Sequence, residues 1–213
     1  GQAGLLMQRY LHASGAPRSA FGAFPMLAHA NAVNNPNAMY RRAMRPEAYD
    51  KADILSDPVN MFDMASYADG AAAVILTTPE IAANAPHPLV TMRGAGGVID
   101  TLAIHDRPDP LGFDAARFAV QRACEMAGVL PGEMDLFELD DAFSIYAVLE
   151  LEAGGWKLGG RGSSPEISGS SGGGIVPRRS RADFIPSFSF LISLSLSEAH
   201  LPPSHFPLPP SPF

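Results

Sequence analysis

Two stretches of the chain place apolar residues at the spacing of an α-helix that faces a core. In 4–12 the leucines and Tyr10 share one helical face, and Gly15 follows as the expected C-cap. In 143–153 the residues are apolar on most sides, and the pattern stops at a pair of glycines. A helix of this second kind belongs inside a large core, so we expect it near the centre of the fold.

A third helix is predicted over 115–127, where alanines and one valine recur at helical spacing. Such a narrow face of small residues suits close packing against a neighbouring element. Asp114 is the expected N-cap, and Gly128 is expected to end the helix in the left-handed conformation.

Strand-like patterns alternate with these helices. The run 71–76 contains only small and branched apolar residues, which is typical of a strand buried on both faces, and Pro79 then opens a short helix. A second strand is predicted over 135–139, and the glycines of 94–97 indicate a tight turn. Alternating strands and helices favour a layered α/β fold with a mixed sheet.

Two regions lack a steady period. Residues 21–63 are rich in alanine, asparagine, proline and methionine, and we interpret them as a long excursion with small helices. From 158 to 213, serine, proline and glycine make up roughly half of the residues, a level at which disorder is the default interpretation. We therefore expect no packed domain in this tail.

Composition narrows the possible partners and compartment. The formal net charge of −7 gives no basis for nucleic-acid binding, and no apolar run is long enough to span a bilayer. The single cysteine, Cys124, cannot form an internal disulfide, which fits the cytoplasm or a reducing organelle such as the peroxisome. The chain begins without a methionine or a signal peptide, and we expect it to be an internal piece of a longer protein.

Asp140 and Asp141 are the strongest candidates for chemistry, because they follow a predicted strand and precede a buried helix. The simpler alternative is a helix cap beside a solvated carboxylate. Cys124 lies mid-helix with nothing to activate it, so we expect an inert core thiol. His29 and His105 are isolated histidines with structural or solvated roles, and no metal site is predicted.

Three motifs together resemble those of the thiolase superfamily in order and spacing. They are the asparagine-rich segment 28–42, the pair 57–58 leading to Asp-Gly-Ala-Ala-Ala at 69–73, and Glu-Leu-Asp-Asp-Ala-Phe at 138–143. The closest similarity is to the branch of the sterol-carrier-protein thiolases and their bacterial and archaeal relatives, and it covers residues 1–157.

The resemblance implies a layered αβαβα thiolase-like fold that is incomplete here and is followed by a disordered tail. Residues 1–85 would form the end of the N-terminal half, with the excursion at 21–63 as the loop domain that covers coenzyme A. Residues 86–157 would begin the C-terminal half. The family acts on coenzyme A thioesters as substrates, without a permanently bound cofactor, and its members are usually dimers; a homodimer or hetero-oligomer is expected of the intact parent.

The resemblance also assigns site residues. Asp140 occupies the position of the asparagine or histidine that holds the oxyanion-hole water, and an anion there would repel a developing oxyanion unless it is protonated or paired. Ala65 and Ser66 lie in the pantetheine region, where many thiolases have serine at the position of Ala65. The nucleophilic cysteine and the later histidine and cysteine segments of the family have no counterpart here, so we expect the isolated chain to be inactive.

Three functions remain open on these grounds. The first is acyl transfer between coenzyme A thioesters by the intact parent enzyme. The second is retro-aldol cleavage of a steroid-like acyl-CoA, since some thiolase-fold proteins of this branch are aldolases. The third is a non-catalytic subunit that binds an acyl-CoA or a partner protein.

Overall fold

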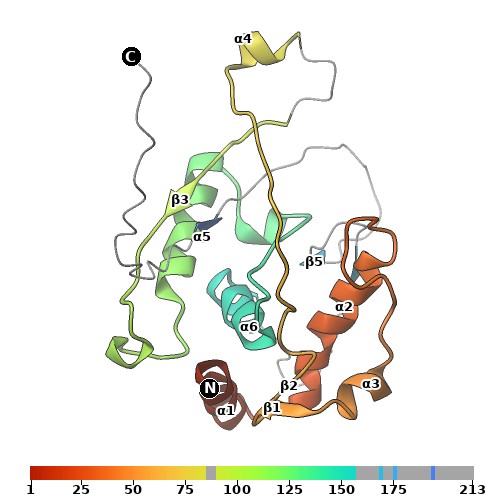
Figure 1. Ribbon diagram of the computed structural model, residues 1–213. Helices are drawn as coiled ribbons and strands as arrows, with labels where there is room; N and C mark the ends of the chain where they lie inside the picture. Colours follow the sequence, from red (N-terminus) through yellow and green to blue (C-terminus); the bar gives the residue numbers. More distant parts are fainter. Residues whose placement is uncertain (85–89, 157–167, 170–174, 177–192, 195–213) are drawn as a thin grey trace, which may run out of the picture.

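The computed structural model describes residues 1–84 and 90–156 and three short strands beyond them (Figure 1). Its described part is mixed α/β and mostly helical. The α-helices are α1 (Gln2–Ser14), α2 (Ala23–Ala32), α3 (Pro46–Asp50), α4 (Pro79–Ala82), α5 (Asp114–Ala127) and α6 (Ser144–Ala153). Three 3₁₀ helices accompany them: η1 (Arg18–Gly22), η2 (Ile104–Asp106) and η3 (Pro131–Glu133).

The strands are short and form two-stranded sheets. In the excursion, β1 (Ile54–Ser56) pairs antiparallel with β2 (Val59–Asn60), with Ser56 opposite Val59. Further along, β3 (Gly96–Gly97) pairs parallel with β6 (Ser193–Leu194), and β4 (Ser168–Gly169) pairs antiparallel with β5 (Ile175–Val176). A layered αβαβα arrangement is therefore not present among the described residues.

Helix α6 forms the centre of the core, as its apolar sequence predicts. Figure 1 shows it between α5 and α2, with α1 below it in that view. Ile145, Ala147, Val148 and Leu149 of α6 are buried, and α1, α2 and α5 all contact this helix. The hydroxyl of Tyr10 on α1 donates a 2.6 Å hydrogen bond to Glu152 at the far end of α6, which joins the two helices.

The glycines of 94–97 do not form the predicted turn; they let the chain lie directly on α5. A Cβ atom on Gly94 would collide with the carbonyl oxygen of Ala123, and one on Gly96 with that of Ala119. Contact this close requires the absence of a side chain on the segment and small residues on the helix. The narrow alanine face of α5 is thus confirmed, and its partner is this glycine segment.

The other helix predictions are confirmed in their positions, with one correction at a cap. Gly15 and Gly128 end α1 and α5 in the left-handed conformation, with φ of 69° and 67°. Asp114, however, does not cap α5: it is the first residue of the helix, and its Oδ1 accepts hydrogen bonds from the Arg117 guanidinium at 2.9 and 3.1 Å. An arginine three residues later competes for the carboxylate that would otherwise reach the helix amides.

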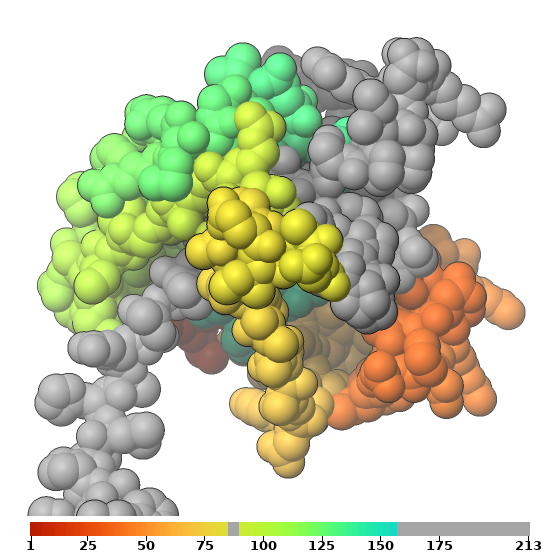
Figure 2. Space-filling view, turned by 90° about the horizontal axis from the view of Figure 1, so that it is seen from above, coloured from red at the N-terminus to blue at the C-terminus, as the bar shows by residue number. Residues whose placement is uncertain are grey.

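Both predicted strands are wrong. Residues 71–76 belong to no strand, and their large side chains, Val74, Ile75 and Leu76, are 78%, 92% and 71% exposed. The segment runs as an extended chain to α4, which projects from the body (Figures 1 and 2). Residues 135–139 form no continuous strand; Phe137 alone takes part in a β-bridge, and it is buried.

The tail prediction for 158–213 lies outside the described residues, apart from the pairs in β4, β5 and β6. The small helices expected within 21–63 are present as α2 and α3, and a short two-stranded sheet, β1 and β2, follows them. The interpretation of this stretch as a loop domain stays a prediction. None of the helices in the described ranges is long and apolar enough to cross a membrane.

Candidate functional site

The end of the excursion lies against the acidic motif that precedes α6. The backbone amide of Ala65 donates a 3.0 Å hydrogen bond to the carbonyl oxygen of Ala142, and Met64 forms an antiparallel bridge with Phe143. Two of the motifs singled out in the sequence, separated by about seventy residues, are therefore neighbours in space. Ala65, Ser66 and Asp140, the three expected site residues, are all exposed.

A buried polar network holds the junction in place. Asp63, which is 1% exposed, accepts 2.8 Å hydrogen bonds at Oδ1 from the hydroxyls of Tyr49 and Ser144. Its Oδ2 accepts the backbone amide of Asn60 at 2.9 Å, and its own carbonyl oxygen accepts the amide of Ser144. Because Ser144 opens α6, the network attaches the excursion directly to the N-terminus of the central helix.

Tyr49 and Asn60 complete this network from within the excursion. The Asn60 amide donates from Nδ2 to the carbonyl oxygen of Tyr49 at 2.9 Å, and its Oδ1 accepts the amides of Phe62 and Asp63. Burial raises the pKa of the Tyr49 hydroxyl, and the hydrogen bond to the Asp63 carboxylate raises it further. The hydroxyl therefore stays protonated as a donor throughout the physiological pH range.

Asp140 closes the turn before α6 but does not cap the helix, whose N-cap residue is Phe143. The Asp140 Oδ1 accepts the backbone amide of Ala142 at 3.0 Å, which is a local Asx-turn. The backbone amide of Asp140 donates in turn to Oε2 of Glu150 at 2.8 Å. Both amides are thus occupied within the protein, and the two acidic residues of this turn, Asp140 and Asp141, are both exposed.

Glu150 was not anticipated from the sequence, although a signal for it existed. It is an acidic residue in a helix that is apolar on most sides, and a carboxylate in such a place needs a partner. Burial raises the pKa of Glu150 to about 7, and the nearby charges of Asp140 and Asp141 also raise it; the hydrogen bond from the Asp140 amide opposes them. The Glu150 carboxyl therefore changes its charge near neutral pH.

His29 ties the asparagine-rich segment to the same region. Its Nδ1 lies 2.9 Å from the carbonyl oxygen of Arg42, which can only accept, so Nδ1 carries the hydrogen and donates. The ring stacks on Tyr40 and meets Phe62 edge-on, both at 6.2 Å between centroids. The Tyr40 hydroxyl lies 3.4 Å from Oγ of Ser66, next to Ala65. His29 thus has the structural role that was expected.

The remaining candidates take no part in the junction. Cys124 is buried in α5, and burial raises the pKa of its thiol, so it is an inert core residue as expected. His105 is exposed beside Asp106, 3.6 Å away. Within the part of the chain that the structure describes, no group of three or more acidic, histidine or cysteine side chains could hold a metal ion.

The family comparison agrees with these motifs. Residues 96–175 match the family model described as thiolase C-terminal domain-like. The chain is 32% identical over 158 residues to an acetyl-CoA acetyltransferase of Methanothermobacter thermautotrophicus, covering 74% of this chain and 41% of that protein.

More distant relatives include lyases. The chain is 26% identical over 156 residues to the 17-hydroxy-3-oxo-4-pregnene-20-carboxyl-CoA lyase of Mycobacterium tuberculosis, covering 71% of this chain and 40% of the lyase. It is also 26% identical over 145 residues to the sterol carrier protein 2 of Oryctolagus cuniculus, covering 64% and 26% of the two chains. The chain thus spans about two fifths of the length of the acetyltransferase and of the lyase.

Among solved structures, the fold is similar to that of an Ltp2–ChsH2(DUF35) aldolase. The TM-score is 0.68 at 23% identity, over 72% of this chain and 42% of the aldolase chain. At this identity the likeness concerns the fold.

Proposed function

Because this chain belongs to the thiolase superfamily, we propose that it forms part of an acyltransferase that acts on coenzyme A thioesters by Claisen condensation or thiolysis. In this proposal residues 1–85 come from the N-terminal half of a layered αβαβα enzyme, with 21–63 as the loop domain over coenzyme A. Residues 86–157 begin the C-terminal half. The intact enzyme is a homodimer or a hetero-oligomer, and coenzyme A thioesters are its substrates.

The observation that carries the proposal is the contact between the excursion and the acidic turn. The hydrogen bond from Ala65 to Ala142 and the bridge between Met64 and Phe143 bring the two segments together, and Ser66 and Asp140, both exposed, flank these contacts along the chain. A thioester whose pantetheine arm passes Ala65 and Ser66 would bring its carbonyl toward Asp140. The buried Asp63 network keeps this geometry rigid, which an oxyanion-stabilising site requires.

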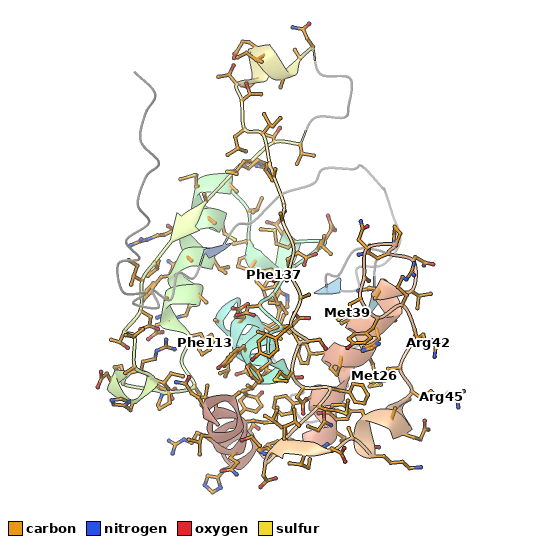
Figure 3. All side chains as sticks on the ribbon, viewed as in Figure 1. Met26, Met39, Arg42, Arg45, Phe113 and Phe137 are labelled. Carbon is orange, nitrogen blue, oxygen red and sulfur yellow. The ribbon has the colours of Figure 1, made fainter. Side chains whose placement is uncertain are left out.

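The outer side of the excursion offers positive charge for the nucleotide end of coenzyme A. Arg41, Arg42 and Arg45 are all exposed, and Figure 3 shows Arg42 and Arg45 at the outer edge of this region. Guanidinium groups bind phosphate through paired, charge-assisted hydrogen bonds. In a chain with a net charge of −7, this local excess of arginine favours binding of the phosphate-bearing end of a ligand at this edge.

Asp140 is proposed to orient the water that faces the thioester carbonyl. Its Oδ1 is paired with the Ala142 amide, which offsets part of the repulsion between this carboxylate and a developing oxyanion and leaves Oδ2 to accept a hydrogen bond from that water. The water would then donate its other hydrogen toward the carbonyl oxygen as negative charge develops there. The nucleophilic thiol is a separate group: Cys124 is buried and lies on α5, and it is not proposed for this role.

Calorimetric titration with acetyl-CoA and with S-acetyl-pantetheine, which lacks the nucleotide phosphates, tests the proposal. We expect acetyl-CoA to bind more tightly, and the double variant Arg42→Ala, Arg45→Ala to lose that difference. Arg9→Ala, an exposed arginine on α1, is the matched control and should bind as the unaltered chain does. Absence of acetyl-CoA binding by the unaltered chain would remove the proposal.

A second candidate is an aldolase subunit that cleaves a steroid-like acyl-CoA. Two relatives are named as a pregnene-carboxyl-CoA lyase and a steroid side-chain-cleaving aldolase, and an aldolase chain shares the fold. Tighter binding of a coenzyme A thioester that bears a fused-ring acyl group than of acetyl-CoA would favour this candidate. Equal binding of both, without turnover by the parent enzyme, would favour a non-catalytic acyl-CoA-binding subunit.

A further inference from the structure

We propose that Glu150 is a positioning residue that fixes the backbone of the acidic turn and thereby sets the place of the Asp140 carboxylate. The inference rests on the proposed function only for its consequence in substrate binding. Its structural part rests on the contacts of the turn itself. Glu150 does not reach the exposed face; it acts through Asp140.

Hydrogen bonds on both sides define the turn. The Asp140 amide donates to Oε2 of Glu150 at 2.8 Å, and the Ala142 amide donates to Oδ1 of Asp140 at 3.0 Å. On the other side, the Ala142 carbonyl oxygen accepts the Ala65 amide. These three hydrogen bonds hold the turn. The bond to Glu150 is the one that fixes the backbone of Asp140, whose carboxylate is proposed to orient the water.

The acceptor is itself held in place. Glu150 lies on α6, whose neighbouring residues Ala147, Val148, Leu149 and Leu151 are all buried in the core. A carboxyl mounted on such a helix has little freedom to move, in contrast to one on a loop. Removing it would leave the Asp140 amide without its partner, and the turn would reorganise to find another acceptor or water.

Both protonation states of Glu150 can accept this hydrogen bond, since each keeps an oxygen with a free lone pair. The amide isostere in Glu150→Gln also keeps such an oxygen, so it should preserve the turn. Glu150→Leu removes the acceptor, and Glu150→Asp withdraws it by one methylene while keeping a carboxylate. Glu152→Leu is the matched control, because Glu152 lies on the same helix but accepts from Tyr10, away from the turn.

Peptide-resolved hydrogen–deuterium exchange of the full chain measures the positioning directly. We expect residues 138–143 to exchange at least about fivefold faster in Glu150→Leu and Glu150→Asp, and unchanged in Glu150→Gln and Glu152→Leu. The α5 peptide, which contains no partner of Glu150 or Glu152, reports whether a variant remains folded. Wild-type exchange of 138–143 in a folded Glu150→Leu or Glu150→Asp chain would overturn the inference.

Titration with acetyl-CoA measures the consequence. The affinity should fall about tenfold in Glu150→Leu and Glu150→Asp, because a lost hydrogen bond of this kind is equivalent to roughly one power of ten, and it should stay within twofold in Glu150→Gln. Faster exchange with unchanged affinity would overturn the positioning role. If the unaltered chain binds no acetyl-CoA, the proposed function fails, and the exchange data still decide whether Glu150 fixes the turn.

Discussion

At the scale of single residues, the Asp63 carboxylate links the excursion to α6. Burying a carboxylate that is 1% exposed costs free energy unless its oxygens accept hydrogen bonds. Here they accept three, from the Tyr49 hydroxyl, the Ser144 hydroxyl and the backbone amide of Asn60. Tyr49 and Asn60 of the excursion and Ser144 of α6 meet at this one side chain. Its loss would detach the excursion from the helix that carries the acidic turn.

Removing a single donor tests this network. We expect Tyr49→Phe to lower the free energy of unfolding by about 1–3 kcal/mol, because the Asp63 carboxylate loses one of its buried donors and nothing replaces it. Urea denaturation followed by the fluorescence of Trp156 measures the change. Tyr40→Phe is the control: its hydroxyl has only a 3.4 Å contact with Ser66 on the exposed side, so the change should stay below about 0.5 kcal/mol.

The raised pKa of Glu150 predicts how stability depends on pH. The pKa is near 7 in the folded chain and 4.5 in its ordinary state, so between these values the folded state binds the additional proton. The corresponding stability is fully present below about pH 4.5 and is lost as the pH rises through 7. Glu150→Gln should remove this slope, so the difference in free energy of unfolding between the two chains should change by on the order of 1–3 kcal/mol from pH 5 to pH 8. A constant difference across that range would contradict the shift.

At this scale the motifs singled out residues whose roles stay predictions, and one residue whose role depends on a partner was missed. The acidic pair and Ala65 were singled out by their resemblance to family motifs, and the structure places Ala65 beside Ala142. Glu150 was missed because its role depends on a hydrogen bond to a residue ten positions earlier. A helical pattern reports which residues face the core, and it does not report which of them accept a backbone amide.

At the scale of elements, the packing of the glycine segment on α5 makes a sharp prediction. Gly94 is buried against the carbonyl oxygen of Ala123, so Gly94→Ala forces the segment and the helix apart. We expect a loss of about 1–3 kcal/mol in the free energy of unfolding, which is typical of overpacking against backbone that cannot yield. Thermal or urea denaturation measures it.

Gly97 provides the matched control within the same segment. A Cβ atom there meets nothing within 4 Å, and its φ is not positive, so Gly97→Ala should change the stability by less than about 0.5 kcal/mol. Equal losses in the two variants would mean that backbone freedom, and not contact with α5, explains the glycines. That outcome would remove the packing account.

The helices were predicted well because their signals are local. Caps, such as Gly15 and Gly128, and a continuous apolar face determine where a helix lies whatever surrounds it. The strand at 71–76 was predicted wrongly because a strand also needs neighbours, which no local pattern can supply. The apolar residues of this segment suit burial on both faces of a sheet. The described part of the chain, however, contains no strand that pairs with it.

At the scale of the whole molecule, this segment exposes three consecutive large apolar residues within the described part of the chain. Residues 66–78 run extended across one face of the molecule and out to α4 (Figure 2), with Val74, Ile75 and Leu76 largely exposed. No backbone amide between residues 66 and 77 forms one of the identified hydrogen bonds with the described part of the chain. An extended apolar strand with free backbone groups is a template for pairing with another chain.

We therefore expect the isolated chain to self-associate through residues 71–76, and a charge at the centre of that run to oppose it. Ile75→Lys should raise the monomer fraction at a given concentration without lowering the melting temperature, because Ile75 is 92% exposed and contributes little to the core. Sedimentation velocity and thermal denaturation measure the two quantities. Leu5→Lys, at a side chain 68% exposed on α1, adds the same charge outside the segment and should leave the monomer fraction unchanged. Equal effects of both substitutions would attribute self-association to overall charge, and a lower melting temperature in Ile75→Lys would mean that the segment is packed in solution.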